Sequence, residues 1–166
     1  MPEADGSIRL RTIQAGDAAA VAALIRAAFA AQSVMTDPPP SALRVTAADV
    51  VAHLRIGSGA VAEVAGTLAG SALWAERDGE LYLGRLAVAP TWRRRGVAKA
   101  LVAAAEAAAL AMDLPRIQLS TRLVLLDNRC LFTACGFIET TREAHPGYAE
   151  PTFVNMEKRL VGSTPH

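Results

Sequence analysis

The sequence predicts an α+β fold, in which a mixed but mostly antiparallel central sheet has helices on both faces. Three apolar, alternating segments lie between residues 60 and 88 and are separated only by Gly66-Thr67 and Asp78-Gly79. Asp-Gly between alternating apolar residues is a strong hairpin signal, so these segments are expected to form an antiparallel meander. A long helix is expected at 97–112. Because a helical crossover joins strands that run the same way, the strands before and after it should be parallel.

The N-terminal third is expected to contain one strand and two helices. Residues 8–12 alternate as a strand does. Asp17 is expected to cap a helix that extends to about Gln32, because the apolar side chains that follow it share one face. Thr46 with Asp49 three residues later is a capping-box pattern, which predicts the start of a second helix.

The remaining elements show either the alternation typical of strands or the spacing typical of helices. Strands are expected at 60–64, 68–76, 81–88, 117–121, 137–141 and 152–158. Pro115 ends the long helix, because proline cannot continue a helical hydrogen-bond ladder. Asp127 is expected to cap a short helix through Ala134, and Gly136 is expected to take the left-handed turn after it.

Length and charge limit the classes of function. The chain has 166 residues and is expected to form a single domain over 1–166, with a loose tail at 161–166. Lys and Arg number 17 and Asp and Glu number 16, which leaves a net charge of +1. This balance gives no global attraction to nucleic acid or to an anionic membrane. Any basic function must therefore be local.

Cysteine spacing and hydropathy predict a cytoplasmic protein without a metal site. Cys130 and Cys135 are five residues apart in an expected helix, where they would not face each other, and they match no zinc spacing. Free thiols suit a reducing compartment. The first residues lack the basic and apolar pattern of a leader, and Lys99 and Glu106 interrupt the longest apolar stretch. We therefore expect neither a signal peptide nor a membrane span.

The most informative segment is a basic loop between a buried strand and the long helix. The strand ends at Pro90, Arg93-Arg94-Arg95-Gly96 follow, and the helix begins at once. A helix N-terminus presents unpaired N–H groups and the positive end of the helix dipole, so it binds phosphate. The small residues Gly96 and Ala98 would let a pyrophosphate approach the backbone, and arginines suit phosphate oxygens.

The spacing Arg93-x-x-Gly96-x-Ala98 resembles the pyrophosphate loop of the GNAT family of N-acetyltransferases, written R/Q-x-x-G-x-G/A. It matches neither a Walker loop, which needs Gly-Lys-Ser/Thr, nor the dinucleotide fingerprint, which needs more than one glycine. The resemblance covers about residues 8–160 and is specific over 85–137. It implies that acetyl-coenzyme A is the co-substrate and that its acetyl group passes by direct attack to a primary amine of a small molecule or a protein.

The resemblance also implies which residues contact the coenzyme. In the family, the strand that ends near Val88 splays from the parallel strand at 117–121, and the pantetheine arm lies in the gap. Asn128 and Phe132 fall on the family's later Asn-x-x-Leu-Phe/Tyr helix, although Asn128 equally suits a helix start beside Asp127. The full expected set is Leu86, Ala87, Val88, Arg93, Arg94, Arg95, Gly96, Val97, Ala98, Lys99, Asn128 and Phe132.

The catalytic groups implied by the resemblance are incomplete in this chain. The backbone N–H of Val88 is the expected oxyanion donor. Many members have a tyrosine at the position of Phe132 that protonates the leaving thiolate, which phenylalanine cannot do. Some relatives have a glutamate base where this chain has Tyr82, so a water chain is an alternative route for the proton.

A loop before the last strand supplies two further candidates, His145 and Tyr148, because such loops flank the acceptor pocket in the family. A histidine titrates near neutrality and could relay a proton, and the alternative for His145 is an ordinary surface histidine. Tyr148 could line the pocket or only cover the sheet edge. Asp37 could pair with an ammonium group or turn the chain at the proline run. The sequence does not name the substrate.

Two other functions are compatible with these observations. Without the tyrosine and the glutamate, the chain could be a catalytically weak or inactive domain that binds and senses acyl-coenzyme A. The three arginines could instead bind nucleic acid, which the near-zero net charge disfavours. A homodimer is expected because the edge strands of such sheets often pair between subunits.

Overall fold

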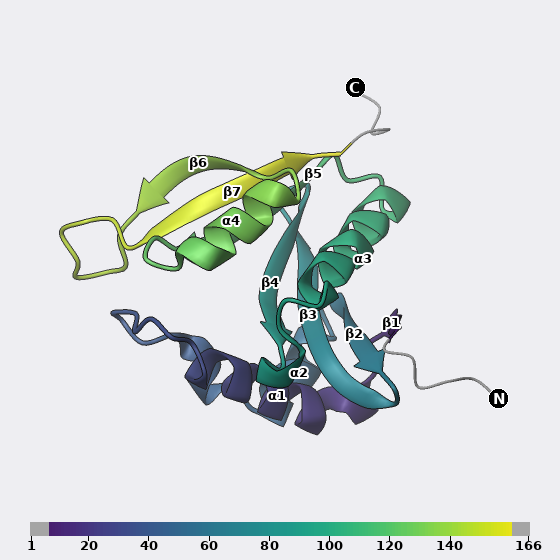
Figure 1. The fold of residues 1–166 in the computed structure, drawn as a ribbon. Helices are drawn as coiled ribbons and strands as arrows, with labels where there is room; N and C mark the ends of the chain where they lie inside the picture. Colours follow the sequence, from purple (N-terminus) through teal and green to yellow (C-terminus); the bar gives the residue numbers. More distant parts are fainter. Residues whose placement is uncertain (1–6, 161–166) are drawn as a thin grey trace.

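A seven-stranded sheet forms the centre of the computed structural model, which describes residues 7–160 (Figure 1). The strands lie in the order β1-β2-β3-β4-β5-β7-β6. Their bounds are β1 Ile8–Thr12, β2 Ser58–Val64, β3 Thr67–Arg77, β4 Glu80–Val88, β5 Arg116–Arg122, β6 Ile138–Glu143 and β7 Phe153–Arg159. Neighbouring strands are antiparallel except β4 and β5, which are parallel. The predicted α+β class and mixed sheet are confirmed, and the predicted tail at 161–166 lies outside the described residues.

Helices cover both faces of the sheet, as expected. Their bounds are α1 Ala18–Ala30, α2 Ala47–His53, α3 Val97–Ala111 and α4 Leu126–Ala134. The buried residues form two clusters: Leu101 of α3 and Phe132 of α4 belong to one, and Ile25 of α1 and Val50 of α2 belong to the other. Because strand side chains alternate between faces, a single strand supplies both clusters.

Two tight turns set the register of the meander. Ala65-Gly66 joins β2 to β3 with φ angles of 52° and 79°, and Asp78-Gly79 joins β3 to β4 with φ angles of 54° and 79°. Two consecutive residues with positive φ are the pattern of a type I′ turn, whose twist matches that of the flanking strands. The hairpin predicted at Asp78-Gly79 is confirmed.

The helix starts follow the sequence in one case and depart from it in two. Thr46 and Asp49 form the predicted capping box at α2. Asp17 occupies the N-cap position of α1, but its carboxylate accepts hydrogen bonds from the Arg11 guanidinium, at 2.8 and 2.9 Å, and from the Gln14 N–H. The Arg11 contact holds the pKa of Asp17 below its ordinary range. The predicted cap at Asp127 is also wrong, because α4 begins before this residue and Leu125 is its N-cap.

The sequence predicts no membrane span, and the length and apolar character of the helices test this expectation. Within residues 7–160, no helix combines the length and the apolar character that crossing a bilayer requires.

Phe137 is the largest side chain in the fully buried part of the core, at 1% exposure, and its ring meets that of Phe132 edge to face at 5.9 Å between centroids. We expect Phe137→Ala to lower the free energy of unfolding by about 3–5 kcal/mol, because it removes apolar contacts and leaves a cavity. Urea titration followed by circular dichroism measures this change. The neighbouring Ile138 is 62% exposed, so Ile138→Ala should change stability by less than about 0.5 kcal/mol. Equal losses of unfolding free energy in Phe137→Ala and Ile138→Ala would contradict the described core.

Candidate active site

Strands β4 and β5 are paired over only two residues each. Only Leu81 with Ile117 and Tyr82 with Gln118 are paired, whereas β5 pairs with β7 along its whole length. Opposite β3, the register of β4 shifts by one residue between Gly84 and Ala87, and Arg85 within this bulge has a φ of 49°. Such a bulge bends and twists its strand. The C-terminal half of β4 therefore diverges from β5, as the resemblance implies.

This divergence leaves the backbone N–H of Val88 without a strand partner on the β5 side. The N–H of Ala89 donates to the carbonyl of Ala69 in β3 at 2.8 Å. Because successive N–H groups of a strand point to opposite sides, the N–H of Val88 points away from β3 and toward the gap. It is therefore available to an oxygen atom placed there.

The N-terminus of α3 opens beside the same gap. Gly96 is its N-cap and has a φ of 84°, a conformation that residues with a Cβ adopt only at a cost. No atom lies within 4 Å of the position that a Cβ of Gly96 would take, so the space before the helix is open. The first N–H groups of α3, together with its dipole, face this space and can receive an anion.

The three arginines of the loop have different surroundings. Arg93 donates to the carbonyl of Ala28 at 2.8 Å and to that of Ala31 at 3.4 Å, so its guanidinium satisfies the end of α1. The guanidinium carbon of Arg95 lies 5.2 Å from the centre of the Trp92 ring. Arg94 has a φ of 62° and lines the groove described next.

A groove of about 750 Å³ lies between the end of β4, the start of α3 and α4. It brings together eleven of the twelve residues predicted to contact the coenzyme, Arg95 being the exception. These eleven are Leu86, Ala87, Val88, Arg93, Arg94, Gly96, Val97, Ala98, Lys99, Asn128 and Phe132. A strand edge with free backbone groups leads to an open helix N-terminus beside cationic side chains. These residues therefore fit an extended pantetheine arm that ends in a pyrophosphate.

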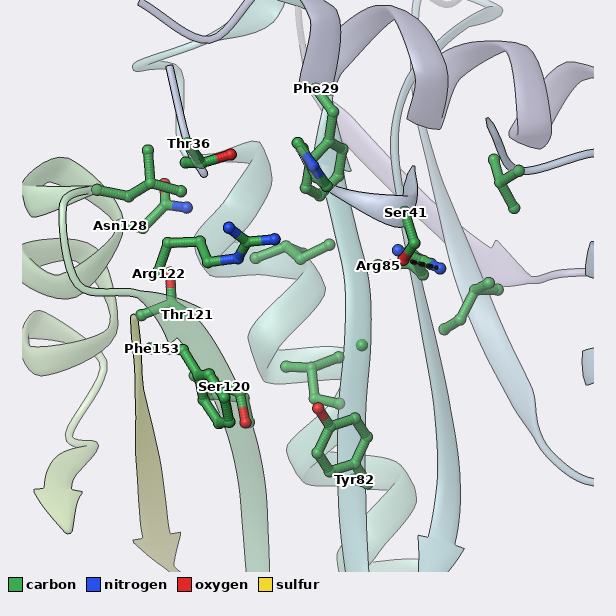
Figure 2. Close-up of a pocket in the computed structure, with 18 of the residues that line it drawn as sticks. Phe29, Thr36, Ser41, Tyr82, Arg85, Ser120, Thr121, Arg122, Asn128 and Phe153 are labelled. Atoms are coloured by element: carbon green, nitrogen blue, oxygen red, sulfur yellow. Dashed lines mark hydrogen bonds between the residues drawn. The ribbon is translucent and has the colours of Figure 1, made fainter. Parts of the chain in front are cut away.

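A second cavity, of about 1090 Å³, adjoins this groove (Figure 2). Its walls come from β4, β5, α2, the turn at Ser41–Arg44 and the loop that contains His145. Six residues line both spaces: Phe29, Gln32, Leu86, Leu125, Asn128 and Phe132. The groove and the cavity therefore meet between the splayed strands. The first can hold one substrate and the second another.

The two candidates from the loop before β7 have different positions. His145 lines the cavity, its Nδ1 hydrogen-bonds the Thr152 hydroxyl, and its ring lies 5.0 Å from that of Phe153. Burial, and secondarily the charge of Arg122, lowers the pKa of His145. Tyr148 lines neither space, and its hydroxyl donates to Asp37 Oδ1 at 2.5 Å. This hydrogen bond raises the pKa of Tyr148 above its ordinary range.

Asp37 accepts that hydrogen bond from Tyr148 and does not line the cavity. Reasoning from the sequence missed much of the cavity lining, including Arg85 and Arg122, whose side chains are shown in Figure 2. The available signal was an arginine inside the otherwise apolar run Leu81–Val88 and another at the end of the strand that contains Ile117. Residues 7–160 contain no cluster of three or more His, Cys, Asp or Glu side chains that could hold a metal ion.

Comparison with solved structures identifies proteins of the same fold. The PaiA N-acetyltransferase of Thermoplasma acidophilum, solved with coenzyme A, is 17% identical, with a TM-score of 0.76 over 93% of this chain and 99% of that one. A GNAT acetyltransferase of Streptococcus pneumoniae is 16% identical, with a TM-score of 0.74 over 93% and 99%. The ribosomal-protein-alanine N-acetyltransferase of Brucella melitensis is 17% identical, with a TM-score of 0.73 over 92% and 99%. At these identities the likeness establishes the fold.

The sequence itself establishes the family. No curated protein matches the chain, but the sequence model of the acetyltransferase (GNAT) family matches residues 20–137. The fold and the matched segment define an N-acetyltransferase that depends on acetyl-coenzyme A. The chain belongs to the acetyltransferase (GNAT) family.

Proposed function

We propose that the groove between β4 and α3 binds acetyl-coenzyme A and that the adjoining cavity admits the acceptor amine, which attacks the acetyl group directly. The observation that best supports this assignment is the gap between β4 and β5, into which the unpaired N–H of Val88 points. The two spaces meet at Leu86 and Phe132, beside this N–H. An amine in the cavity can therefore reach an acyl group in the groove.

The coenzyme end of the site is held by backbone groups and by charge. The free edge of β4 at 86–88 would hold the pantetheine amides, and the start of α3 would hold the pyrophosphate. Arg94 and Lys99 line the groove and would neutralise phosphate charge. Arg93 lines it too, but its guanidinium also binds the end of α1, so we assign it partly to positioning.

When bound, acetyl-coenzyme A supplies an activated thioester, and the chain's own groups stabilise its reaction with the amine. The N–H of Val88 would donate to the carbonyl oxygen as that oxygen gains negative charge. As the new carbon–nitrogen bond forms and the carbon–sulfur bond breaks, the attacking nitrogen must lose a proton. Phe132 has no proton to give to the thiolate, so this chain has no tyrosine acid at that position.

His145 is our candidate for receiving the amine proton. It lines the cavity, and its lowered pKa keeps the ring neutral at pH 7, so that it can accept a proton. Tyr148 remains protonated and is bound to Asp37, so we propose that it positions the loop rather than exchanges protons. The alternative of an inactive domain that senses acyl-coenzyme A predicts binding without transfer to any amine.

Two further proposals concern the state of the protein in the cell. Strand β6 forms one edge of the sheet with all of its side chains exposed, which supports pairing between two copies. Sedimentation at micromolar concentration tests this, and a monomer would contradict it. Cys130 and Cys135 are both free, which supports a reducing, cytoplasmic location that cell fractionation can test.

Replacing Gly96 tests the coenzyme groove. We expect Gly96→Glu to weaken acetyl-coenzyme A binding by about three powers of ten, because two like charges 4 Å apart at an effective dielectric of 20 repel by about 4 kcal/mol. Isothermal titration measures the affinity. Gly66→Glu is the matched control, since Gly66 also has a positive φ, 79°, and open space around it, but lies in the β2–β3 turn. Unchanged affinity in Gly96→Glu would remove the proposed groove.

The pH dependence of turnover tests His145. Because its pKa is lowered from 6.5, kcat should fall only as the pH drops below that value, when the ring gains a proton and cannot accept another. We expect His145→Gln to lose this acidic inflection and to lower kcat by about 100-fold. His53→Gln should keep the inflection, since the His53 ring is bound to the carbonyls of Ser58 and Trp74. An inflection that persists in His145→Gln would show that another titratable group, and not His145, accepts the proton.

A further inference from the structure

We propose that the acceptor is a small amine that also carries an anionic group, a carboxylate or a phosphate, and that Arg85 and Arg122 bind this group. The inference rests on the proposed function, since it concerns the cavity assigned to the acceptor. It names a substrate class and two specificity-determining residues.

The charge of the cavity is the first observation. Four arginines line it, Arg44, Arg77, Arg85 and Arg122, against a single carboxylate, Asp49. That carboxylate accepts the Thr46 N–H at 2.9 Å in the capping box of α2. None of the four arginines forms a salt bridge within residues 7–160. The cavity therefore has an uncompensated positive charge, although the whole chain is nearly neutral.

Arg85 occupies an unusual place in the sheet. It lies in the β4 bulge, with a φ of 49°, and it directly precedes Leu86 at the junction of the two spaces. The residue is partly exposed, and its guanidinium donates to the neutral hydroxyl of Ser41 at 3.0 Å (Figure 2). An arginine has five N–H donors, so most of those on Arg85 are free to bind a ligand.

Arg122 comes to the same cavity from the end of β5 (Figure 2). Its Nη1 donates to the carbonyl of Pro38 at 2.6 Å. Burial lowers the pKa of Arg122, and the nearby Tyr148 and Asp37 offset this only partly. A partly buried guanidinium without a carboxylate partner is costly, and an anion in the cavity would compensate it.

The two arginines also bear on the chemistry of the amine. A positive cavity repels an ammonium ion, so it disfavours simple cationic amines such as polyamines. An acceptor with its own anion is attracted, and the neighbouring positive charge lowers the pKa of its ammonium group toward the reactive neutral form. Leu86 and Leu125, which follow Arg85 and Arg122 closely in the chain, line the junction of the two spaces. The anion would thus bind close to the reacting nitrogen, which favours a small molecule over a protein.

Matched acceptor pairs test this class. Initial rates with acetyl-coenzyme A would be compared for amino acids against their carboxamides, and for phosphoethanolamine against ethanolamine. We expect the anionic member of at least one pair to have a kcat/KM more than tenfold higher. The amino acid pairs report a carboxylate and the phosphoethanolamine pair reports a phosphate. A protein acceptor would instead show transfer only to peptides, which would overturn the proposal.

Two variants assign the residues. Arg85→Gln and Arg122→Gln should each reduce the preference for the anionic member by about 10- to 100-fold, as expected for a lost charge-assisted hydrogen bond, mainly through KM. Arg122→Lys should keep part of the preference and guards against a folding defect, which a thermal melt also detects. Arg9→Gln, on the exposed edge strand β1, is the control and should keep the full preference.

The outcomes separate this inference from the proposed function. If amino acids and their carboxamides are acetylated at equal rates, and these rates are unchanged in both arginine variants, the inference is overturned. The proposed acetyltransferase site then stays intact. Binding of acetyl-coenzyme A without transfer to any amine overturns the proposed transfer instead. In that case, titration with N-acetylated amino acids tests whether the cavity has the anion site. Saturable binding that Arg122→Gln abolishes supports the site, and no binding refutes it.

Discussion

The active site depends on one interruption of hydrogen bonding, the early end of the β4–β5 ladder. Buried backbone N–H and C=O groups are almost always paired, so an open strand edge inside a sheet is a place where another molecule can supply the partner. Here the bulge at Arg85 bends β4 away, while β7 satisfies β5 from the other side. The open edge, the unpaired N–H of Val88 and access to the start of α3 all follow from this single departure from regular pairing.

The charges of the chain are distributed so that its two substrate spaces are basic and its total charge is not. Exposed ion pairs such as Arg11 with Asp17 and Arg129 with Glu139 neutralise arginines at the surface. In contrast, Arg94 at the proposed coenzyme groove and Arg85 and Arg122 in the proposed acceptor cavity form no salt bridge among the described residues. This separation lets the protein attract anions locally without the general affinity for polyanions that a high net charge produces.

Contacts between distant loops hold together the segments around the proposed acceptor cavity. Tyr148 binds Asp37, and Arg122 binds the carbonyl of Pro38, so the proline-rich loop is tied to β5 and to the loop before β7. These residues are far apart in the sequence, and each contact uses a polar group that has no partner within its own element. The Pro38 contact uses only one nitrogen of the Arg122 guanidinium, which leaves its other donors available.

The sequence by itself determined the meander, the long helix and the basic loop before it, because local patterns specify each: alternation, an Asp-Gly turn, and the spacing from Arg93 to Ala98. It could not show that Arg95 faces Trp92 or that Asp17 binds Arg11, since side chains choose partners only after the chain has folded. Only the tertiary structure decided which residues form the acceptor cavity. The residues that line it come from β4, β5, α2 and two loops, and the periodicity of a sequence does not indicate contacts between distant segments.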